Sequence, residues 1–262
     1  MSARELEARL AAATTIAREA GKLALEWWTG KRALGTTFKG RHDFLTQADG
    51  AVEVLVRERL AAAFPGDAFV GEEGGGAGGT SQWVVDPIDG TSNFATGVAD
   101  WCVSIGYREV GIAKVGVIFA PVLGELYAAR TGGGAFKNDA RIAVMEPPTG
   151  GAILDIDWGN GISKADYFGL VGRVVDAGLD FRRAGSAALA LARVAAGARH
   201  GYLQLWTKTW DAMAGVVIVR EAGGVTNPFE DGVDLKQGNP ILATTPGLGA
   251  LVSRLSGIPL RA

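Results

Sequence analysis

The chain has 262 residues, 48% of them hydrophobic, which is enough for a sizeable core in one large domain or two small ones. Its 26 Lys and Arg residues against 28 Asp and Glu give a net charge of −2, so no basic field favours nucleic acid, and small-molecule partners are expected. The single cysteine, Cys102, excludes an internal disulfide framework, and no run reaches the ~18 uninterrupted apolar residues of a membrane span. Because the charged first residues also lack a signal-peptide core, we expect a cytoplasmic protein that binds neither nucleic acid nor membranes.

The first predicted element is a long amphipathic helix from Arg4 to Trp28. From Leu6 onward its apolar residues recur at helical spacing, which indicates a single packed face. Trp27 and Trp28 near its end are expected in the core or at a subunit interface, and they favour a homodimer.

A second amphipathic helix follows Asp49 and is stopped by the segment Phe64 to Asp67. The four residues Thr46 to Asp49 fit a capping box, so one interpretation gives Asp49 only the task of starting this helix. A polar stretch that contains Lys39 precedes it.

A glycine string, GEEGGGAGG, runs from Gly71 to Gly79. Its second part matches the G-x-G-x-x-G pattern of dinucleotide-binding sites. That fingerprint must follow a strand and open a helix, whereas this string leads into another strand, so we reject a nicotinamide-dependent oxidoreductase. Glu72 and Glu73 are expected at the end of a short strand, Ala68 to Val70.

The chain is organised around the run WVVDPIDGTSNF, residues 83–94. A short β-branched strand is followed by two carboxylates in a turn of restricted geometry, made by Asp86, Pro87, Asp89 and Gly90. Converging carboxylate and carbonyl oxygens suit Mg²⁺, and the neighbouring Thr91 could orient a water. Taken alone, the segment is equally compatible with an ordinary turn.

The remaining elements divide near Pro147. Before it, three β-rich segments predict an antiparallel meander: Trp101–Arg108, Lys114–Ala120 and Glu125–Ala129. After it, strands and helices alternate: strand Ala152–Trp158, helix Ser163–Ala177, strand Phe181–Arg183, helix Ser186–Ala196, strand Gly201–Leu205, helix Asp211–Glu221, strand Ile241–Thr244 and a helix near Leu248–Leu255. We therefore expect a mixed α/β protein with an N-terminal α+β sub-lobe, residues 1–146, and a C-terminal α/β sub-lobe, residues 147–262, forming one catalytic unit.

Three motifs in a fixed order make the chain resemble a known family. They are Gly-Glu-Glu at residues 71–73, Asp-Pro-Ile-Asp-Gly-Thr at residues 86–91, and Trp-Asp at residues 210–211, followed by an apolar helix and Glu-Ala-Gly-Gly. Together they resemble the inositol monophosphatase family of Mg²⁺-dependent, lithium-sensitive sugar phosphatases, over about residues 39–224. The resemblance implies a five-layered αβαβα sandwich and supports a homodimer.

The resemblance also implies a set of metal ligands and catalytic groups. One Mg²⁺ would be bound by Glu72, Asp86 and the carbonyl of Ile88, a second by Asp86, Asp89 and Asp211, and a third, weaker ion near Glu72 and Asp49. Glu72 and Thr91 would orient the nucleophilic water, with Glu73 in support, while Asp49 would hydrogen-bond Thr91. Lys39 resembles a family lysine on a loop over the site. For Asp211 alone, a structural interpretation is also open, because an acid in the first turn of a helix interacts favourably with the helix macrodipole.

Substrate-binding residues are implied in both halves: Asp89, Gly90, Thr91, Gly185, Ser186, Ala187, Gln204 and Asp211. The segment around Gly185 to Ala187 resembles the family pocket for the alcohol, although Ser186 could equally be an N-cap. Gln204 stands where inositol-hydrolysing members carry a glutamate, which weakens the inference that inositol is the alcohol.

The expected activity is hydrolysis of inositol monophosphate or a similar small polyol phosphate by in-line attack of a metal-activated water. The alternatives within the same chemistry are a histidinol-phosphate phosphatase, a fructose-1,6-bisphosphatase and a nucleotide 3′-phosphatase. A regulatory protein that retains the fold is the non-enzymatic alternative. None of the acids and the threonine that the chemistry needs is replaced in this chain.

Overall fold

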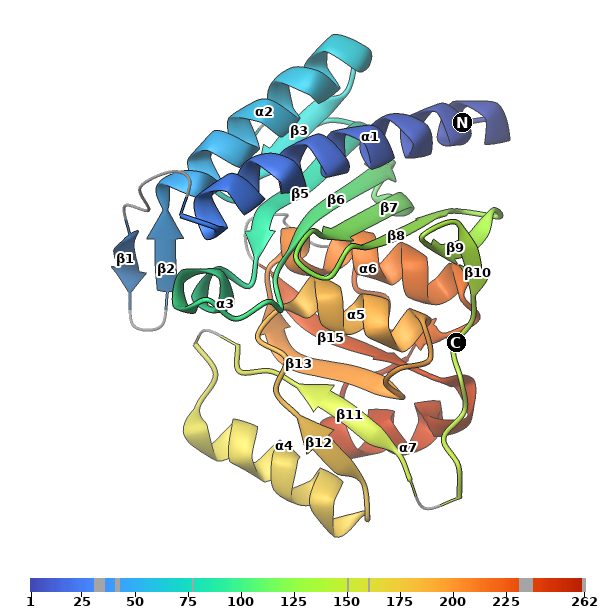
Figure 1. Cartoon of the computed structure of the whole chain (residues 1–262). Helices are drawn as coiled ribbons and strands as arrows, with labels where there is room; N and C mark the ends of the chain where they lie inside the picture. Colours follow the sequence, from blue (N-terminus) through green and yellow to red (C-terminus); the bar gives the residue numbers. More distant parts are fainter. Residues whose placement is uncertain are drawn as a thin grey trace.

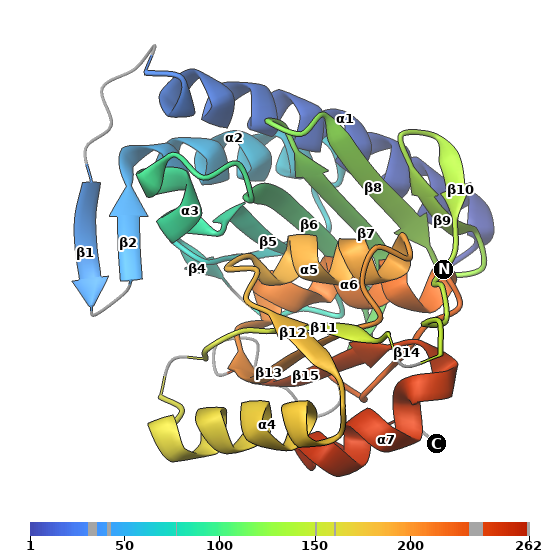
Figure 2. The same ribbon diagram turned by 60° about the horizontal axis from the view of Figure 1, so that its bottom comes forward.

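The computed structural model describes residues 1–30, 36–40, 43–76, 78–149, 151–159, 161–230 and 238–260. Helices and sheets alternate in five layers, as Figures 1 and 2 show. The order is a helix pair, an eight-stranded sheet, a second helix pair, a five-stranded sheet and a third helix pair. The αβαβα sandwich expected from the sequence is confirmed. Within the described part of the chain, no helix is long and apolar enough to cross a bilayer.

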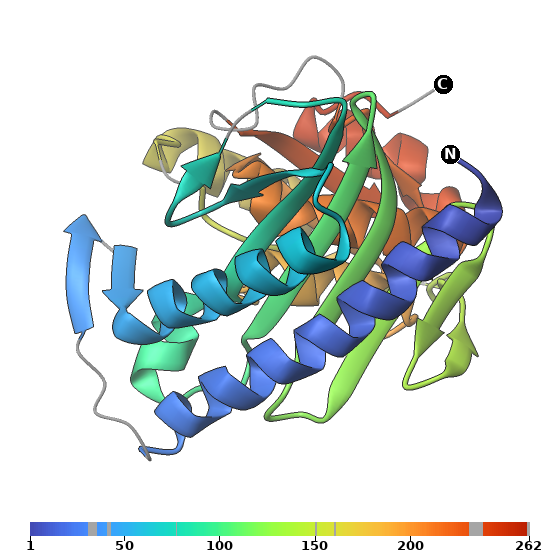
Figure 3. The same cartoon turned by 90° about the horizontal axis from the view of Figure 1, so that it is seen from above.

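The first layer consists of α1 (Ala3–Trp28) and α2 (Gln47–Ala63), which cross one face of the large sheet (Figure 3). Ser2 starts α1 through a capping box with Glu5, because each accepts a hydrogen bond from the other's backbone N–H. The buried stripe of α1 consists mainly of alanines, so the helix lies close to the strands. At the end of α1, Trp28 packs against Trp101 with ring centroids 6.4 Å apart.

The eight-stranded sheet has the order β10-β9-β8-β7-β6-β5-β3-β4. Its strands are β3 (Ala68–Gly71), β4 (Gly75–Gly76), β5 (Ser81–Asp89), β6 (Cys102–Glu109), β7 (Ile112–Ala120), β8 (Glu125–Arg130), β9 (Gly134–Lys137) and β10 (Ala140–Ile142). The predicted meander is present as β6, β7 and β8, and all neighbours are antiparallel except β3 and β5, which are parallel. The hairpin β9–β10, which sequence analysis did not predict, extends the meander at the sheet edge.

The central layer contains α5 (Ala187–Ala195) and α6 (Thr209–Glu221), which pack between the two sheets (Figure 2). Glycines permit the close contact between α6 and the large sheet. A Cβ added at Gly116 of β7 would lie 2.1 Å from the carbonyl oxygen of Ala214, and one at Gly106 of β6 would lie 2.9 Å from Met213. These contacts fix the height of α6, and with it Asp211, above the strands.

The second sheet has the order β12-β11-β13-β15-β14. Its strands are β11 (Ile153–Ile156), β12 (Asp180–Arg182), β13 (Gly201–Thr207), β14 (Val225–Thr226) and β15 (Asn239–Thr244). The first three strands are parallel, and β15 is antiparallel to both β13 and β14. The outer helices α4 (Lys164–Asp176) and α7 (Pro246–Ser256) cover its far face, so the predicted alternation after Pro147 is present.

A short hairpin and a short helix complete the description of the fold. Strands β1 (Thr36–Gly40) and β2 (Asp43–Thr46) form an antiparallel hairpin beside α2 and α3, which sequence analysis did not predict (Figure 1). Helix α3 (Thr91–Thr96) follows β5 directly. The side chain of Lys39, which lies in β1, is outside the described residues.

Candidate active site

The cluster of acids begins in β5, which continues beyond the segment that the sequence predicts. We expected the strand to end at Val85 and a turn to follow, but β5 pairs with β6 as far as Asp89. The register shifts between Asp86 and Asp89, so the two residues that separate them form a bulge rather than a turn. The N–H of Ile88 donates to Oδ1 of Asp86 at 2.9 Å, which holds this carboxylate.

Helix α3 begins directly after the acids because Gly90 has a φ of 92°, in the left-handed region that favours glycine. The hydroxyl of Thr91 donates to the carbonyl oxygen of Ile88 at 3.0 Å. Asn93 of the same helix donates to the carbonyl oxygens of Asp100, at 2.7 Å, and Ala184, at 3.2 Å. The helix therefore connects the end of β5 to the segment that precedes α5.

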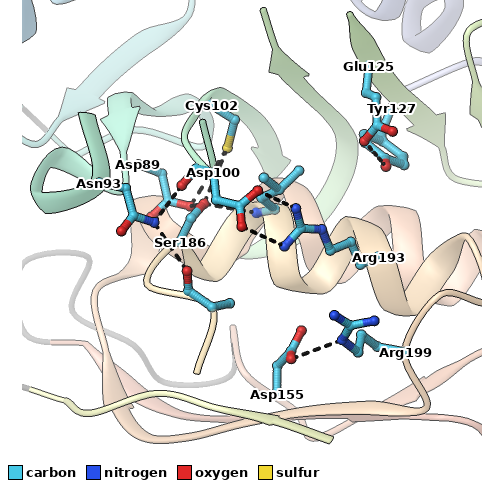
Figure 4. A network of polar contacts seen from close by, with 12 residues as sticks. Asp89, Asn93, Asp100, Cys102, Glu125, Tyr127, Asp155, Ser186, Arg193 and Arg199 are labelled. Atoms are coloured by element: carbon cyan, nitrogen blue, oxygen red, sulfur yellow. Dashed lines mark hydrogen bonds and ion pairs between the residues drawn. The ribbon is translucent and has the colours of Figure 1, made fainter. Parts of the chain in front are cut away.

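Asp89 is held by residues from the other half of the chain (Figure 4). Its carboxylate accepts hydrogen bonds from the hydroxyl of Ser186 at 2.5 Å and from the N–H groups of Ala188 at 2.7 Å and Ala187 at 3.3 Å. Ser186 is also the N-cap of α5, because its oxygen accepts the N–H of Leu189. The expected N-cap is thus present, and the same hydroxyl orients Asp89.

Asp211 is in the first turn of α6 and combines a helix-start role with a place in the acid cluster. One of its oxygens accepts from the hydroxyl of Thr207 at 2.7 Å and from the N–H of Lys208 at 3.3 Å. Oxygen atoms of Asp86, Asp89 and Asp211 nevertheless lie within 4.8 Å of one another. The structure thus brings together three acids that are far apart in the sequence.

The cluster is electrostatically strained when all three acids are ionised. Burial raises the pKa of Asp86 well above its ordinary value, and the nearby charges of Glu72, Asp89 and Asp211 raise it further. Burial and Asp211 raise the pKa of Asp89 to about 7, against the hydrogen bonds from Ser186 and α5. Burial raises the pKa of Asp211 to about 6. A hard divalent cation would relieve this repulsion, and the donors are all oxygens, so the residues fit Mg²⁺.

Glu72 lies beside Asp86 because β3 and β5 run parallel in register, with Gly71 opposite Val85. It lines the same pocket as the three aspartates. Asp49 of α2 is also buried and its charge contributes to the raised pKa of Asp86, which places it near the cluster. Glu73 is not among the described residues that line the pocket.

Sequence analysis missed Glu53, which fixes the loop that carries Glu72. The carboxylate of Glu53 is buried and accepts the N–H of Glu73 at 2.7 Å and the N–H of Gly74 at 2.8 Å. It also forms an ion pair with Arg57 at 2.6 Å. The only sequence signal is its position four residues after Asp49, on the same face of α2.

The pocket continues from the acids into the C-terminal half of the chain. Of the residues expected to bind substrate, Asp89, Gly90, Thr91, Gly185, Ala187, Gln204 and Asp211 line it. Ser186 contacts Asp89 instead. The lining also includes residues that sequence analysis did not single out: Asp157, Trp158, Arg183, Trp206 and Lys208.

Comparisons with known proteins agree with this architecture. Residues 5–256 match the model of the inositol monophosphatase family. The Nus factor SuhB of Pasteurella multocida is 36% identical over 236 residues, 88% of each chain, and that of Escherichia coli K12 is 35% identical over 240 residues, 89% of this chain and 90% of the relative.

Solved structures are similar over nearly the whole chain. The extragenic suppressor protein suhB of Bartonella henselae superposes with a TM-score of 0.87 at 31% identity, covering 95% of this chain and 98% of that one. An IMPase of Thermotoga maritima gives a TM-score of 0.83 at 30% identity, covering 95% and 96%. The chain therefore belongs to the inositol monophosphatase family.

Proposed function

We propose that this protein is a Mg²⁺-dependent phosphomonoesterase that hydrolyses inositol monophosphate or a similar small polyol phosphate. The observation that carries the proposal is the convergence in one pocket of Asp86 and Asp89, both buried, and the partly buried Asp211, with oxygens within 4.8 Å of one another. Such a cluster destabilises a protein unless a cation offsets it. Family membership supports the same chemistry at the level of a metal-dependent phosphatase.

In this proposal, Glu72, Asp86 and the carbonyl of Ile88 hold one Mg²⁺, and Asp86, Asp89 and Asp211 hold a second. A third, weaker ion near Asp49 and Glu72 is part of the same proposal. When bound, the ions supply an activated water and neutralise charge on the phosphoryl group.

The protein's own part in the reaction is to orient the water and the ester. The hydroxyl of Thr91 directs its hydrogen to the carbonyl oxygen of Ile88, which leaves the Thr91 oxygen as an acceptor for a proton of the attacking water. The Ile88 carbonyl keeps a second lone pair for a metal. Glu72, held in place by the loop that Glu53 fixes, accepts the other proton of the water, and Glu73 contributes through its backbone.

The alcohol of the substrate is proposed to lie along Gly185, Ala187 and Gln204, which line the pocket beyond the acids. Homodimer formation and inhibition by lithium are proposed on the ground of family membership, and a cytoplasmic location on the ground of the single, buried cysteine. Light scattering of the purified protein tests the first of these, and hydrolysis assays with added Li⁺ test the second.

The test is release of phosphate from inositol 1-phosphate, histidinol phosphate, fructose 1,6-bisphosphate and a nucleoside 3′-phosphate, each with Mg²⁺ and with EDTA. Asp86→Asn should lower kcat at least about 10³-fold, because metal stabilisation of the transition state contributes several kcal/mol. Asp166→Asn is the matched control and should retain activity, because Asp166 is an exposed acid in the first turn of α4, where its carboxylate accepts the hydroxyl of the N-cap Ser163. Hydrolysis that persists in EDTA, or in Asp86→Asn, would contradict the proposal.

A second candidate is a regulatory protein that retains the fold, since the curated relatives carry the name Nus factor. The retention of all the acids favours the enzyme. The two candidates differ in one outcome: a purely regulatory role predicts that no phosphate ester on the panel is hydrolysed with Mg²⁺.

A further inference from the structure

The pocket lining also contains a carboxylate and a guanidinium without an assigned role, Asp157 and Arg183. Of the carboxylates that line the described pocket, Asp157 is the one outside the cluster formed by Glu72 and the three aspartates. Its side chain is only 7% exposed, at the carboxyl end of β11. Arg183 lies beside it with a 65% exposed side chain, and its Nε is 3.8 Å from Oδ1 of Asp157.

Gln204, the residue at the position of the family glutamate, is already engaged with the protein. The hydroxyl of Tyr202 donates to Oε1 of Gln204, and Nε2 of Gln204 donates to the carbonyl oxygen of Trp158 at 3.4 Å. These bonds fix the orientation of the amide and leave one lone pair on Oε1 and one N–H on Nε2. A carboxylate elsewhere in the pocket lining would be a stronger hydrogen-bond acceptor for the alcohol than this amide.

Asp157 has this capacity and is oriented toward the site. The N–H of Gly185 lies 3.0 Å from one of its oxygens and 3.2 Å from the other, so lone pairs remain on the carboxylate. The same short segment holds Asp89, through Ser186 and the next two N–H groups. Consecutive residues thus hold two carboxylates of the pocket lining, Asp157 through Gly185 and Asp89 through the next three residues.

We propose that Asp157 and Arg183 form the specificity-determining pair for the alcohol, and that they select a neutral cyclic polyol with adjacent hydroxyls. One hydroxyl donates to Asp157 and its neighbour accepts from Arg183. The inference rests on the proposed phosphatase function and adds the residues that select its alcohol.

Charge and shape favour this class over an amino alcohol. A carboxylate alone would attract an ammonium group, but the guanidinium of Arg183 beside it repels one. Trp206 also lines the pocket, and the flat apolar surface of an indole suits the carbon face of a ring, whereas the Trp158 ring packs against Tyr167 and Phe168 of α4. Lys208 lies over the ring of Trp206, with its Nζ 4.9 Å from the centroid, and adds a second positive charge.

The test compares kcat/KM for inositol 1-phosphate with kcat/KM for 4-nitrophenyl phosphate, whose alcohol has no further hydroxyl. In Asp157→Asn the ratio should fall about tenfold or more, mainly through KM, because a hydrogen bond to a charged acceptor is replaced by one to an amide. The variant keeps an oxygen for the N–H of Gly185. Asp155→Asn is the matched control: it removes a buried carboxylate from the same strand, paired with Arg199 outside the pocket, and should leave the ratio unchanged.

A second arm uses histidinol phosphate as the amino-alcohol ester. The wild-type protein should hydrolyse it less efficiently than inositol 1-phosphate, and Arg183→Gln should narrow that difference. If the ratio of kcat/KM for inositol 1-phosphate to kcat/KM for 4-nitrophenyl phosphate is unchanged in Asp157→Asn, Asp157 has a purely structural role. If the wild type prefers histidinol phosphate, the substrate class is wrong. Either result overturns the inference, provided that 4-nitrophenyl phosphate is still hydrolysed. Absence of hydrolysis of all three esters would instead overturn the proposed phosphatase function, and the inference with it.

Discussion

Asp211→Asn should make the metal-free protein more stable while removing its activity. The carboxylate of Asp211 accepts hydrogen bonds from Thr207 and Lys208 through one oxygen, and an asparagine can accept both through Oδ1. Its NH₂ group would then replace the other oxygen and face Asp86 and Asp89 as a donor instead of a third negative charge. The substitution preserves shape and removes a negative charge that burial makes costly, and it also removes a charge that raises the pKa of Asp86 and Asp89.

The magnitude follows from the raised pKa of Asp211. A rise from 3.8 to about 6 corresponds to about 3 kcal/mol, at 1.36 kcal/mol per pH unit. Because the folded state holds the proton more tightly than the unfolded state, this cost is absent below about pH 4 and complete above about pH 6. The free energy of unfolding of the variant should therefore exceed that of the wild type by an amount that increases as pH rises from about 4 to about 6.

Denaturant titration in EDTA at pH 4.5 and pH 8 measures the effect, and at pH 8 a gain of about 3 kcal/mol would raise Tm by roughly 6–10 °C. Added Mg²⁺ should stabilise the wild type by about 3 kcal/mol at a hundredfold excess over Kd and the variant much less. If Asp211→Asn is less stable than the wild type in EDTA at pH 8 and gains equally from Mg²⁺, the electrostatic reasoning is wrong.

Three further predictions concern Glu53 beside the site and two glycines, one under α6 and one in α4. Glu53→Gln should lower kcat about tenfold, because the loop that carries Glu72 loses a charged acceptor. KM should change little in steady-state assays. An unchanged kcat would show that Glu53 does not position Glu72. Gly116→Ala should destabilise the protein by about 2 kcal/mol or more in chemical denaturation, because the new Cβ would overlap the carbonyl of Ala214 in α6. Gly172→Ala, in α4 with open space around it, should instead stabilise by about 0.5–1 kcal/mol, and a loss of stability would show that its helix is not as described.

The sequence predicts most elements because their hydrophobic periodicity is local. The long first helix, the meander and the alternating second half are present close to their expected bounds. The bulge in β5 was missed because Pro87 favours a turn, whereas pairing with β6 continues as far as Asp89 and pairing with β3 ends at Val85. The β9–β10 hairpin is short, with strands of four and three residues, so its own pattern is weak.

Some residues of the candidate site are predicted by sequence motifs, whereas the roles of others depend on contacts that form only in the folded chain. Asp86, Asp89, Asp211 and Glu72 carry motif signals, and the structure places them in one pocket. Glu53 and Asp157 have no motif. Their importance depends on which backbone N–H groups the fold brings to them, at residues 73–74 and at Gly185, and a linear sequence does not encode these contacts in any short pattern.

Diffraction from crystals soaked in Mn²⁺, recorded at the manganese absorption edge, tests the central claim most directly, because Mn²⁺ takes the same oxygen ligands as Mg²⁺ and scatters anomalously. The account predicts one anomalous peak bounded by Asp86, Asp89 and Asp211, and another between Glu72 and Asp86. Well-ordered carboxylates with no peak between them, or peaks only elsewhere on the protein, would contradict it.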